Sequence, residues 1–222
     1  MSDIVSNIIS LKRQIPLSVR LVAVSKTKSV SDILEAYSAG QRAFGENRVQ
    51  ELLSKKDKLP PDVEWHLIGH LQSNKIKYIV PFISMIHSVD SFRLLTAIDE
   101  EAGKIKRQID CLIQFHIARE ETKYGFSFKE ADEMMGTDEF RNLKNVRICG
   151  VMGMATFTDD TSVVRSEFRD LATHFKALKD KYFNRLPYFK ELSMGMSGDF
   201  LTAIEEGSTM VRIGSIIFGE RS

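Results

Sequence analysis

The sequence contains little cysteine, almost no net charge and no long hydrophobic run. Its 222 residues include two cysteines, Cys111 and Cys149, which lie in separate apolar stretches and form no CxxC motif. Such isolated cysteines predict reduced thiols in a protein core and argue against a disulfide framework or a metal-binding pair. The 31 basic and 30 acidic residues give a formal net charge of +1. A chain this close to neutrality has little general attraction for nucleic acid, so we expect no nucleic-acid partner.

The sequence also lacks the segments that direct a chain into or across a membrane. Residues 1–16 contain Asp3 and do not show the basic start and apolar run of a secretory signal. No apolar stretch reaches the roughly 20 residues that a membrane-spanning helix needs. We therefore expect a cytoplasmic protein that does not bind a membrane.

What the sequence does contain is an alternation of short apolar runs and amphipathic stretches. The amphipathic stretches have the apolar spacing of helices, and several of them end at a glycine. The predicted helices cover residues 31–39, 46–56, 92–102 (ending at Gly103), 161–182 and 200–206. The apolar runs predict strands at residues 20–25, 43–44, 64–68, 85–88, 110–116, 146–150, 191–194 and 210–213.

Eight strand–helix units in a chain of this length fit a (β/α)8 barrel, for which about 250 residues is typical. A doubly wound open sheet is the alternative. The very short second strand and the polar residues at strand ends favour the barrel. We expect an additional helix before the first strand. Only residues 214–222 follow the last strand, so we expect one domain over residues 1–222.

A lysine follows the first predicted strand. The apolar run before it places Lys26 at the carboxyl end of the strand, which is the functional face of a (β/α)8 barrel. Loss of water around its amine and the nearby Lys28 would both lower the pKa of Lys26, and a neutral amine is what Schiff-base chemistry requires. This segment alone does not distinguish that role from a lysine that extends into solvent.

Two loops near the C-terminus have the composition of a phosphate site. The loops after the seventh and eighth strands of such barrels often bind phosphate through backbone N–H groups. Here these loops supply glycines that allow a close backbone approach and serines that can donate hydroxyl groups, although ordinary tight turns would explain the glycines equally well. The residues are Gly195, Ser197, Gly198, Gly214 and Ser215.

An arginine interrupts the last apolar strand. A buried arginine is rarely unpaired, so Arg212 is expected either to form an ion pair with Glu206 or Glu220 or to meet a ligand inside the barrel. A lysine for an imine, a cup for a phosphate and an internal arginine together match the aldehyde, phosphate and ring nitrogen of pyridoxal 5'-phosphate (PLP).

Several longer motifs resemble those of one family. They are AVSKTK (23–28), FGENRVQE (44–51), WHLIGHLQSNK (65–75), HSVDS (87–91), GVMGMA (150–155), LSMGMSGDF (192–200), AIEEGSTMVRIG (203–214) and IFGER (217–221). With them the sequence resembles the pyridoxal phosphate homeostasis protein family, whose barrel is like the N-terminal domain of alanine racemase. The resemblance implies that PLP is held as a Schiff base on Lys26.

The resemblance also implies roles for further residues. Asn47 would lie near the cofactor, and Arg212 would face its pyridine nitrogen. The phosphate would be held by Ser197, with Ser193 and Met194 nearby, and by Gly214 and Ser215. The sequence departs from the family pattern at Ser29, at Arg48 and in the loop that contains Lys123, which leaves the roles of these rim residues open.

For function, the resemblance implies a PLP carrier that takes part in PLP homeostasis without robust turnover. A monomer that passes PLP to PLP-dependent apo-enzymes is expected. A weak PLP-dependent amino-acid racemase is the alternative. An arginine at the ring nitrogen suits imine formation and cofactor holding more than broad amino-acid chemistry, because an unprotonated ring is a weaker electron sink, although alanine racemase works with this arrangement. A class I aldolase-like barrel would use the same lysine and phosphate cup for a sugar phosphate.

Two histidines, His66 and His70, are four residues apart, a spacing that would suggest a metal site on a helix. Because this segment reads as a strand followed by a loop, we expect no metal site. His66 is expected to pack inside the barrel and His70 to lie near the cofactor face. Methionines at the ends of the sixth and seventh strands are expected to form apolar walls around a ligand. They are Met152, Met154, Met194 and Met196.

Overall fold

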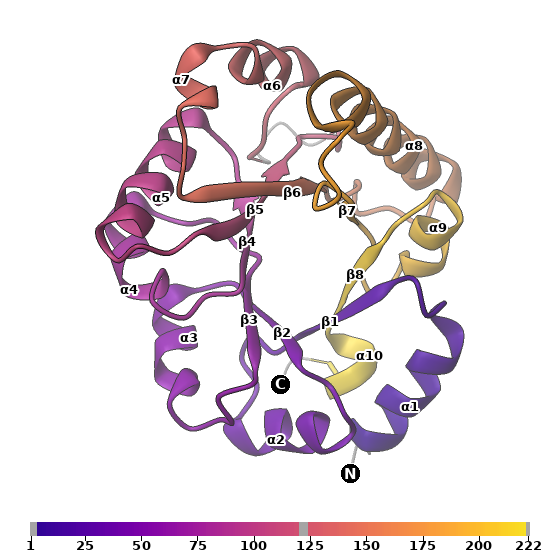
Figure 1. The fold of residues 1–222 in the computed structure, drawn as a ribbon. Coiled ribbons are helices and arrows are strands. Elements are labelled where there is room, and N and C mark those ends of the chain that lie inside the picture. The colour runs from indigo at the N-terminus through magenta and orange to yellow at the C-terminus, as the bar shows by residue number, and fades with distance from the viewer. Residues whose placement is uncertain (1–3, 120–123, 221–222) are drawn as a thin grey trace.

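The computed structural model describes residues 4–119 and 124–220. Eight parallel strands form a closed barrel in chain order, with helices around the outside (Figure 1). The pairing of β1 with β8, in which Leu21 lies opposite Val211, closes the barrel. The predicted (β/α)8 barrel is confirmed and the doubly wound sheet is wrong. The strands are β1 Arg20–Val24, β2 Ala43–Glu46, β3 Glu64–Leu67, β4 Met85–Val89, β5 Ile109–Gln114, β6 Val146–Met152, β7 Glu191–Ser193 and β8 Met210–Ile213.

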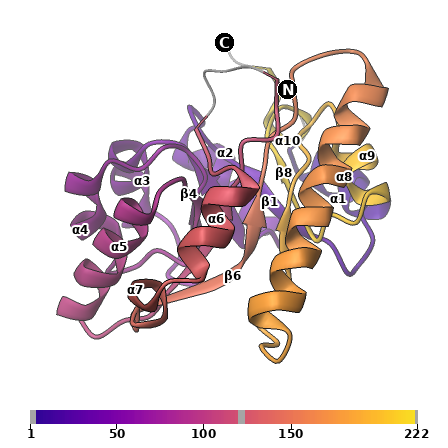
Figure 2. The ribbon, with the colours of Figure 1, turned by 90° about the horizontal axis from the view of Figure 1, so that it is seen from above.

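The outer layer of helices begins with the expected additional helix, α1 (Ile4–Gln14), which packs against α10 at the other end of the described chain. Figure 2 shows the helices on the outside of the strands, with the long α8 on one flank. The remaining helices are α2 Val30–Ser38, α3 Val49–Lys56, α4 Ile76–Ile79, α5 Phe92–Lys104, α6 Phe128–Met135, α7 Asp138–Arg141, α8 Thr161–Leu178, α9 Phe200–Glu205 and α10 Ser215–Phe218. A 3-10 turn, η1 (Ser73–Lys75), precedes α4, and a π-helical turn, η2 (Lys179–Phe183), follows α8.

Three helix boundaries differ from the prediction by two or more residues. Helix α5 continues through Gly103, because the left-handed residue that follows it is Lys106, with φ 54°. Helix α3 starts at Val49 and not at residue 46, since Arg48 before it has an extended backbone and Glu46 belongs to β2. Helix α8 ends at Leu178, where the π-helical turn replaces regular hydrogen bonding. In each case the local backbone, which the apolar spacing does not report, sets the boundary.

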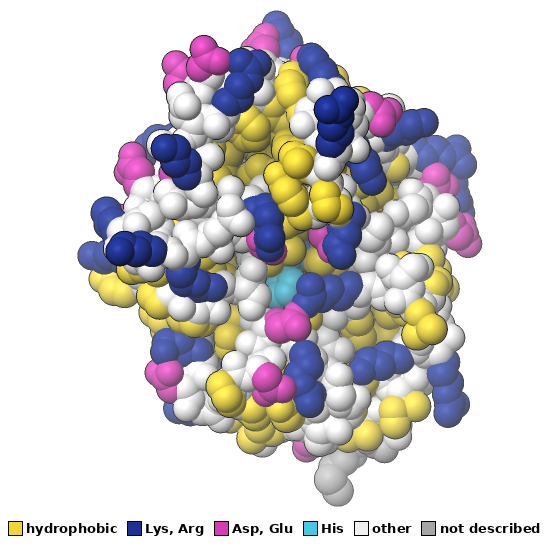
Figure 3. Space-filling view, viewed as in Figure 1, with side chains coloured by type: hydrophobic (Ala, Val, Ile, Leu, Met, Phe, Trp, Pro, Cys, Tyr) yellow, Lys and Arg dark blue, Asp and Glu magenta, His cyan; other side chains and the backbone are white. Residues whose placement is uncertain are grey.

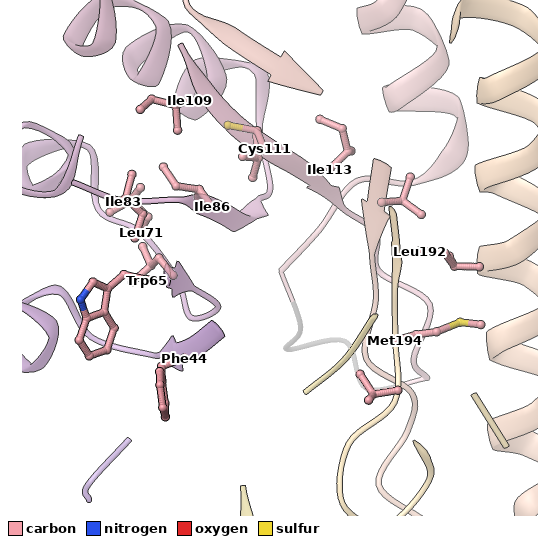
Figure 4. Packing of buried hydrophobic residues seen from close by; sticks show 14 of the residues in the cluster. Phe44, Trp65, Leu71, Ile83, Ile86, Ile109, Cys111, Ile113, Leu192 and Met194 are labelled. Atoms are coloured by element: carbon pink, nitrogen blue, oxygen red, sulfur yellow. The ribbon is translucent and has the colours of Figure 1, made fainter. Parts of the chain in front are cut away.

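The barrel strands are buried on both faces, as parallel strands usually are. A large apolar cluster fills the layer between strands and helices, and Phe44, Trp65, Ile86 and Leu192 belong to it (Figure 4). Alternate positions of the same strands form a second, smaller cluster, which comprises Val22, Ala43, Met85, Leu112, Cys149, Met152 and Met210. Both cysteines are buried and unpaired, so the prediction of reduced core thiols is confirmed.

Charged side chains close the amino end of the barrel. Arg20 at the start of β1 forms an ion pair with Glu64 at the start of β3. Arg147 in β6 binds both carboxylate oxygens of Asp110 in β5, at 2.6 and 2.8 Å.

Figure 3 shows basic and acidic side chains interspersed over the viewed face. In the part of the chain that the structure describes, no helix combines the length and the apolar character needed to cross a membrane.

Candidate binding site at the carboxyl end of the barrel

A cavity of about 680 Å³ contains residues from the carboxyl ends of several strands and from the loops that follow them. Six of the eight predicted site residues line it: Lys26, Asn47, Ser197, Arg212, Gly214 and Ser215. Ser193 and Met194 do not occur among its described lining residues, and both side chains are fully buried. The structure therefore brings together a lysine, an arginine and the two Gly/Ser loops around one cavity.

Lys26 stands two residues after the end of β1, on the wall of the cavity. The preceding residue, Ser25, continues the strand pairing by donating its amide to the Gly45 carbonyl at 3.0 Å. Lys26 is half-buried, and Thr27 after it has a left-handed backbone with φ 66°. The second lysine of the motif, Lys28, donates its ammonium to the Phe218 and Glu220 carbonyls at 3.0 and 3.3 Å. Lys28 thus holds the end of α10 and the residue Glu220 beyond it, whereas Lys26 lies just after the end of β1.

The two Gly/Ser loops meet at the ends of β7 and β8, and β8 is the strand next to β1. The amide of Gly214 donates to Ser197 Oγ at 3.4 Å, which connects the loop after β7 to the loop after β8. Gly195 permits this approach because its φ is +95° and a Cβ there would lie 2.6 Å from Ala203 Cβ. Asp199 accepts the Met196 amide at 2.6 Å and stabilises the turn. Serine hydroxyls and loop amides here can bind an anion such as a phosphate.

Arg212 lies inside the barrel at the base of the cavity and is only 4% exposed. Its Nη1 donates to the Ser193 carbonyl at 2.8 Å and to Ser193 Oγ at 2.7 Å, and its Nη2 donates to the Gly153 carbonyl at 2.9 Å. Burial lowers the pKa of Arg212 to about 10. The ion pair with Glu206 considered from the sequence is wrong, because Glu206 binds Arg165 and Arg169 on the surface. In place of Glu220, the other acidic residue considered, Arg212 binds the Ser193 and Gly153 carbonyls.

A chain of buried polar side chains continues inward from Arg212. Ser193 Oγ lies 3.3 Å from His87 Nδ1, and His87 Nε2 lies 2.8 Å from His66 Nδ1. Burial lowers the pKa of His66 to about 3 and the pKa of His87 well below its usual value, so both rings are neutral. The prediction that His66 packs inside the barrel is confirmed. His70 is separate from it and pairs with Asp90 at 3.1 Å.

The sequence reasoning missed part of the cavity wall. The loop after β6 contributes Thr156, Phe157, Thr158 and Asp159. A polar run, TFTDDTS at residues 156–162, directly after an apolar strand was the available signal. His87 was also missed as a partner of Ser193, although it stands in a buried strand where a histidine needs a hydrogen bond.

The remaining predicted residues fall in several places. Of the four methionines, Met154 and Met196 line the cavity, whereas Met152 and Met194 are buried in the core. Arg48 is exposed at the start of α3. Lys123 lies outside the described residues.

These residues set the chemistry that the cavity can support. A half-buried amine can condense with an aldehyde, and the two loops can bind a phosphate. The guanidinium can interact with the part of a ligand that lies between these two groups. This arrangement fits a small ligand that carries an aldehyde, a phosphate and an uncharged ring acceptor.

Comparison with known proteins places the chain in a family. Residues 1–222 match the family described as "Alanine racemase, N-terminal domain". A "Pyridoxal phosphate homeostasis protein" from Synechocystis is 40% identical over 212 residues, covering 93% of this chain and 94% of the relative. The protein of that name from Escherichia coli is 36% identical over 235 residues, covering 100% and 98%.

Solved structures agree with the sequence matches. The structure of PipY from Synechococcus elongatus, described as having PLP bound, has a TM-score of 0.88 and 37% identity, covering 97% of this chain and 100% of that one. An alanine racemase from Bartonella henselae with covalently bound PLP has a TM-score of 0.73 at 18% identity, over 98% of this chain and 58% of that one, and shows the fold alone. The chain belongs to the alanine racemase N-terminal domain family and, within it, to the pyridoxal phosphate homeostasis proteins.

Proposed function

We propose that this protein binds PLP in the cavity at the carboxyl end of the barrel and acts as a PLP carrier in intracellular PLP homeostasis. The observation that carries the proposal is the meeting of Lys26, Arg212 and the two Gly/Ser loops in one cavity. The relationship to PipY, whose structure has PLP bound, supports the same ligand.

Each part of the cavity matches one part of PLP. Lys26 would hold the aldehyde carbon through a C=N bond, and Ser197, Gly214 and Ser215 would hold the phosphate. Asn47 lines the same cavity as Lys26 and would contact the ring. When bound, PLP supplies an aldehyde for amines and an electron-accepting ring. Ser193 would act through its hydrogen bonds to Arg212, and Met194 through packing under the phosphate loop.

Arg212 favours holding PLP over turning over amino acids. Its three hydrogen bonds to Ser193 and Gly153 fix the guanidinium at the base of the cavity. A fixed cation beside the pyridine nitrogen disfavours protonation of the ring. An unprotonated ring withdraws electrons less strongly, so bond breaking at a bound amino acid is slower.

The carrier role has three further aspects. We propose that the protein works in the cytoplasm, that it is a monomer, and that it releases PLP to PLP-dependent apo-enzymes. The C=N bond to Lys26 is reversible by water, which allows both uptake and release.

The test is a visible absorbance spectrum of the purified protein with added PLP, followed by borohydride reduction and peptide mass mapping. We expect a stoichiometric chromophore and a reduced pyridoxyl group on Lys26. A protein that forms no chromophore with PLP would contradict the proposal and favour a sugar phosphate as the aldehyde or ketone ligand.

A second measurement separates a carrier from an enzyme. The PLP-loaded protein is incubated with L-alanine, and the optical rotation is followed. A carrier leaves the rotation constant, whereas its steady loss would identify the protein as a racemase.

A further inference from the structure

A buried cluster of charged side chains lies beneath the loop that carries Lys26. Its centre is Lys55 in α3, whose side chain is only 7% exposed. The Lys55 ammonium donates to Glu46 Oε1 at 2.8 Å, to Glu51 Oε1 at 2.6 Å and to the Ser25 carbonyl at 2.9 Å. All three hydrogens of the ammonium are therefore used, and one of them reaches the backbone next to Lys26.

The same cluster holds the chain on both sides of Lys26. Before it, Ser25 accepts from Lys55 through its carbonyl and donates its hydroxyl to Glu46 Oε1 at 2.6 Å. After it, the Thr27 amide donates to Glu51 Oε1. Thr27 adopts φ 66°, a left-handed conformation that is unfavourable for a β-branched residue and persists only where its surroundings hold it. The Glu51 carboxylate supplies that hold.

The cluster is a poor way to stabilise the fold. Burial raises the pKa of the Glu46 carboxyl, against the hydrogen bonds from Lys55 and Ser25 that lower it. Glu46 Oε2 is buried and has no hydrogen-bond partner within the described residues. A buried ion pair often contributes less to stability than apolar side chains of the same volume would. What the charges provide, and apolar residues could not, is a bond to each peptide that flanks Lys26.

We propose that Lys55, together with Glu46 and Glu51, is a positioning residue that presents the Lys26 amine to the aldehyde of PLP. This inference rests on the proposed function. In the step concerned, the Lys26 nitrogen forms a C=N bond with the aldehyde carbon and the aldehyde oxygen leaves as water. The phosphate loops follow β7 and β8, whereas the hydrogen bonds of the cluster join α3 and β2 to the peptides that flank Lys26. Loss of the cluster should therefore weaken the covalent bond more than phosphate binding.

The experiment compares two ligands. PLP can form the C=N bond, whereas 4-deoxypyridoxine 5'-phosphate has the same ring and phosphate but no aldehyde. Dividing the Kd of the deoxy compound by the Kd of PLP gives the gain from the covalent bond. For Lys55→Met we expect this gain to fall at least tenfold, with the Kd of the deoxy compound changed less than twofold. The control is Lys56→Met, which removes the next lysine of α3, an ion-pair partner of Asp57.

A second pair of variants keeps the test independent of how Lys55→Met folds. Glu51 is 22% exposed at its side chain, so its replacement leaves less of a hole. Glu51→Ala removes the acceptor of the Thr27 amide and should lower the gain, whereas Glu51→Gln keeps an oxygen acceptor there and should restore most of it.

The outcomes separate this inference from the proposed function. If the wild type gains nothing from the aldehyde, the proposed function fails. If the wild type gains but Lys55→Met and Glu51→Ala gain equally, the proposed function stands and the positioning role is overturned. Parallel loss of affinity for both ligands would also overturn it, since that indicates a collapsed cavity.

Discussion

The two ends of the barrel use charged residues in opposite ways. At the amino end, Arg20 pairs with Glu64 and Arg147 pairs with Asp110, so these charges neutralise one another. At the carboxyl end, Lys26 and Arg212 line a cavity. Barrels of this kind place stability at the amino end and chemistry at the carboxyl end. Basic side chains therefore form ion pairs at the amino end of the barrel and line the ligand cavity at the carboxyl end.

The two ends are connected through the barrel interior. Arg212 binds Ser193, Ser193 contacts His87, and His87 contacts His66. The positive charge of Arg20 at the amino end contributes to lowering the pKa of His66. Along this line, a substitution near the carboxyl end should alter the affinity for PLP, and one nearer the amino end should alter the free energy of unfolding.

The largest effect is expected at the carboxyl end, for Lys26→Ala. This variant cannot form the C=N bond, so the chromophore that borohydride can trap should be lost and the affinity for PLP should fall by about 100-fold or more. The free energy of unfolding without PLP should stay within about 0.5 kcal/mol of wild type, because a half-buried surface lysine stabilises little. Absorbance titration and urea unfolding measure the two quantities. The control, Lys75→Ala, should retain the chromophore; its loss there would identify Lys75 as the reactive lysine.

Arg212→Gln should affect both PLP and stability. Removing the guanidinium leaves the Ser193 and Gly153 carbonyls without their donors, at a cost of about 2 kcal/mol in the free energy of unfolding. With PLP bound, loss of the cation should raise the pKa of the ring nitrogen, which is measured by titrating the chromophore. The control, Arg165→Gln, breaks a surface pair with Glu205 and Glu206 and should leave the titration unchanged. An unaltered titration for Arg212→Gln would contradict its place at the ring nitrogen.

The order of strands could be predicted from the sequence because each strand is buried on both faces and reads as an apolar run. Helix boundaries could not, as Gly103 shows. A glycine often ends a helix, but α5 passes through Gly103 and leaves the left-handed position to Lys106. The short 43–44 run became a four-residue strand, because Gly45 and Glu46 pair with β3 despite being poor strand formers.

The residues of the cavity could be predicted where a charged side chain stands just after an apolar strand or within one, as Lys26 and Arg212 do. Contacts that depend on three-dimensional packing could not. The Lys55 ammonium braces Lys26 through the Ser25 carbonyl, which is 30 positions away in the sequence. In the sequence, the cluster of Lys55, Lys56 and Lys58 predicts a solvated helix end. That expectation is wrong, because Lys55 is buried and its neighbour Lys56 takes the more exposed position.

His66, which lies between the two ends, should make the free energy of unfolding depend on pH. In the folded protein its pKa is about 3, whereas in the unfolded chain it is about 6.5. Between these values the unfolded state binds a proton that the folded state does not, so the free energy of unfolding falls as the pH falls. His66→Gln should therefore lose about 2 kcal/mol less than wild type between pH 7 and pH 5. Urea unfolding at the two pH values measures this difference.

The matched control for this pH effect is His70→Gln. His70 is exposed and pairs with Asp90, so its replacement removes a histidine without changing the barrel interior. A wild-type pH dependence in His66→Gln would show that His66 is protonated inside the barrel, contrary to its burial.

The smallest effect is expected at the amino end, for Arg147→Ala. Asp110 binds Arg147 through two hydrogen bonds, and it holds the pKa of Arg147 above its usual value. Solvent reaches the pair, since the side chains are 41% and 23% exposed, so we expect a loss of only about 0.5 to 1 kcal/mol in the free energy of unfolding. The affinity for PLP should be unchanged, because the pair lies at the opposite end of the barrel. Arg141→Ala, which breaks an exposed pair with Asp138 within α7, is the control for a purely surface charge. A weaker affinity for PLP in Arg147→Ala, at unchanged stability, would contradict the assignment of ligand binding to the carboxyl end and of stability to the amino end.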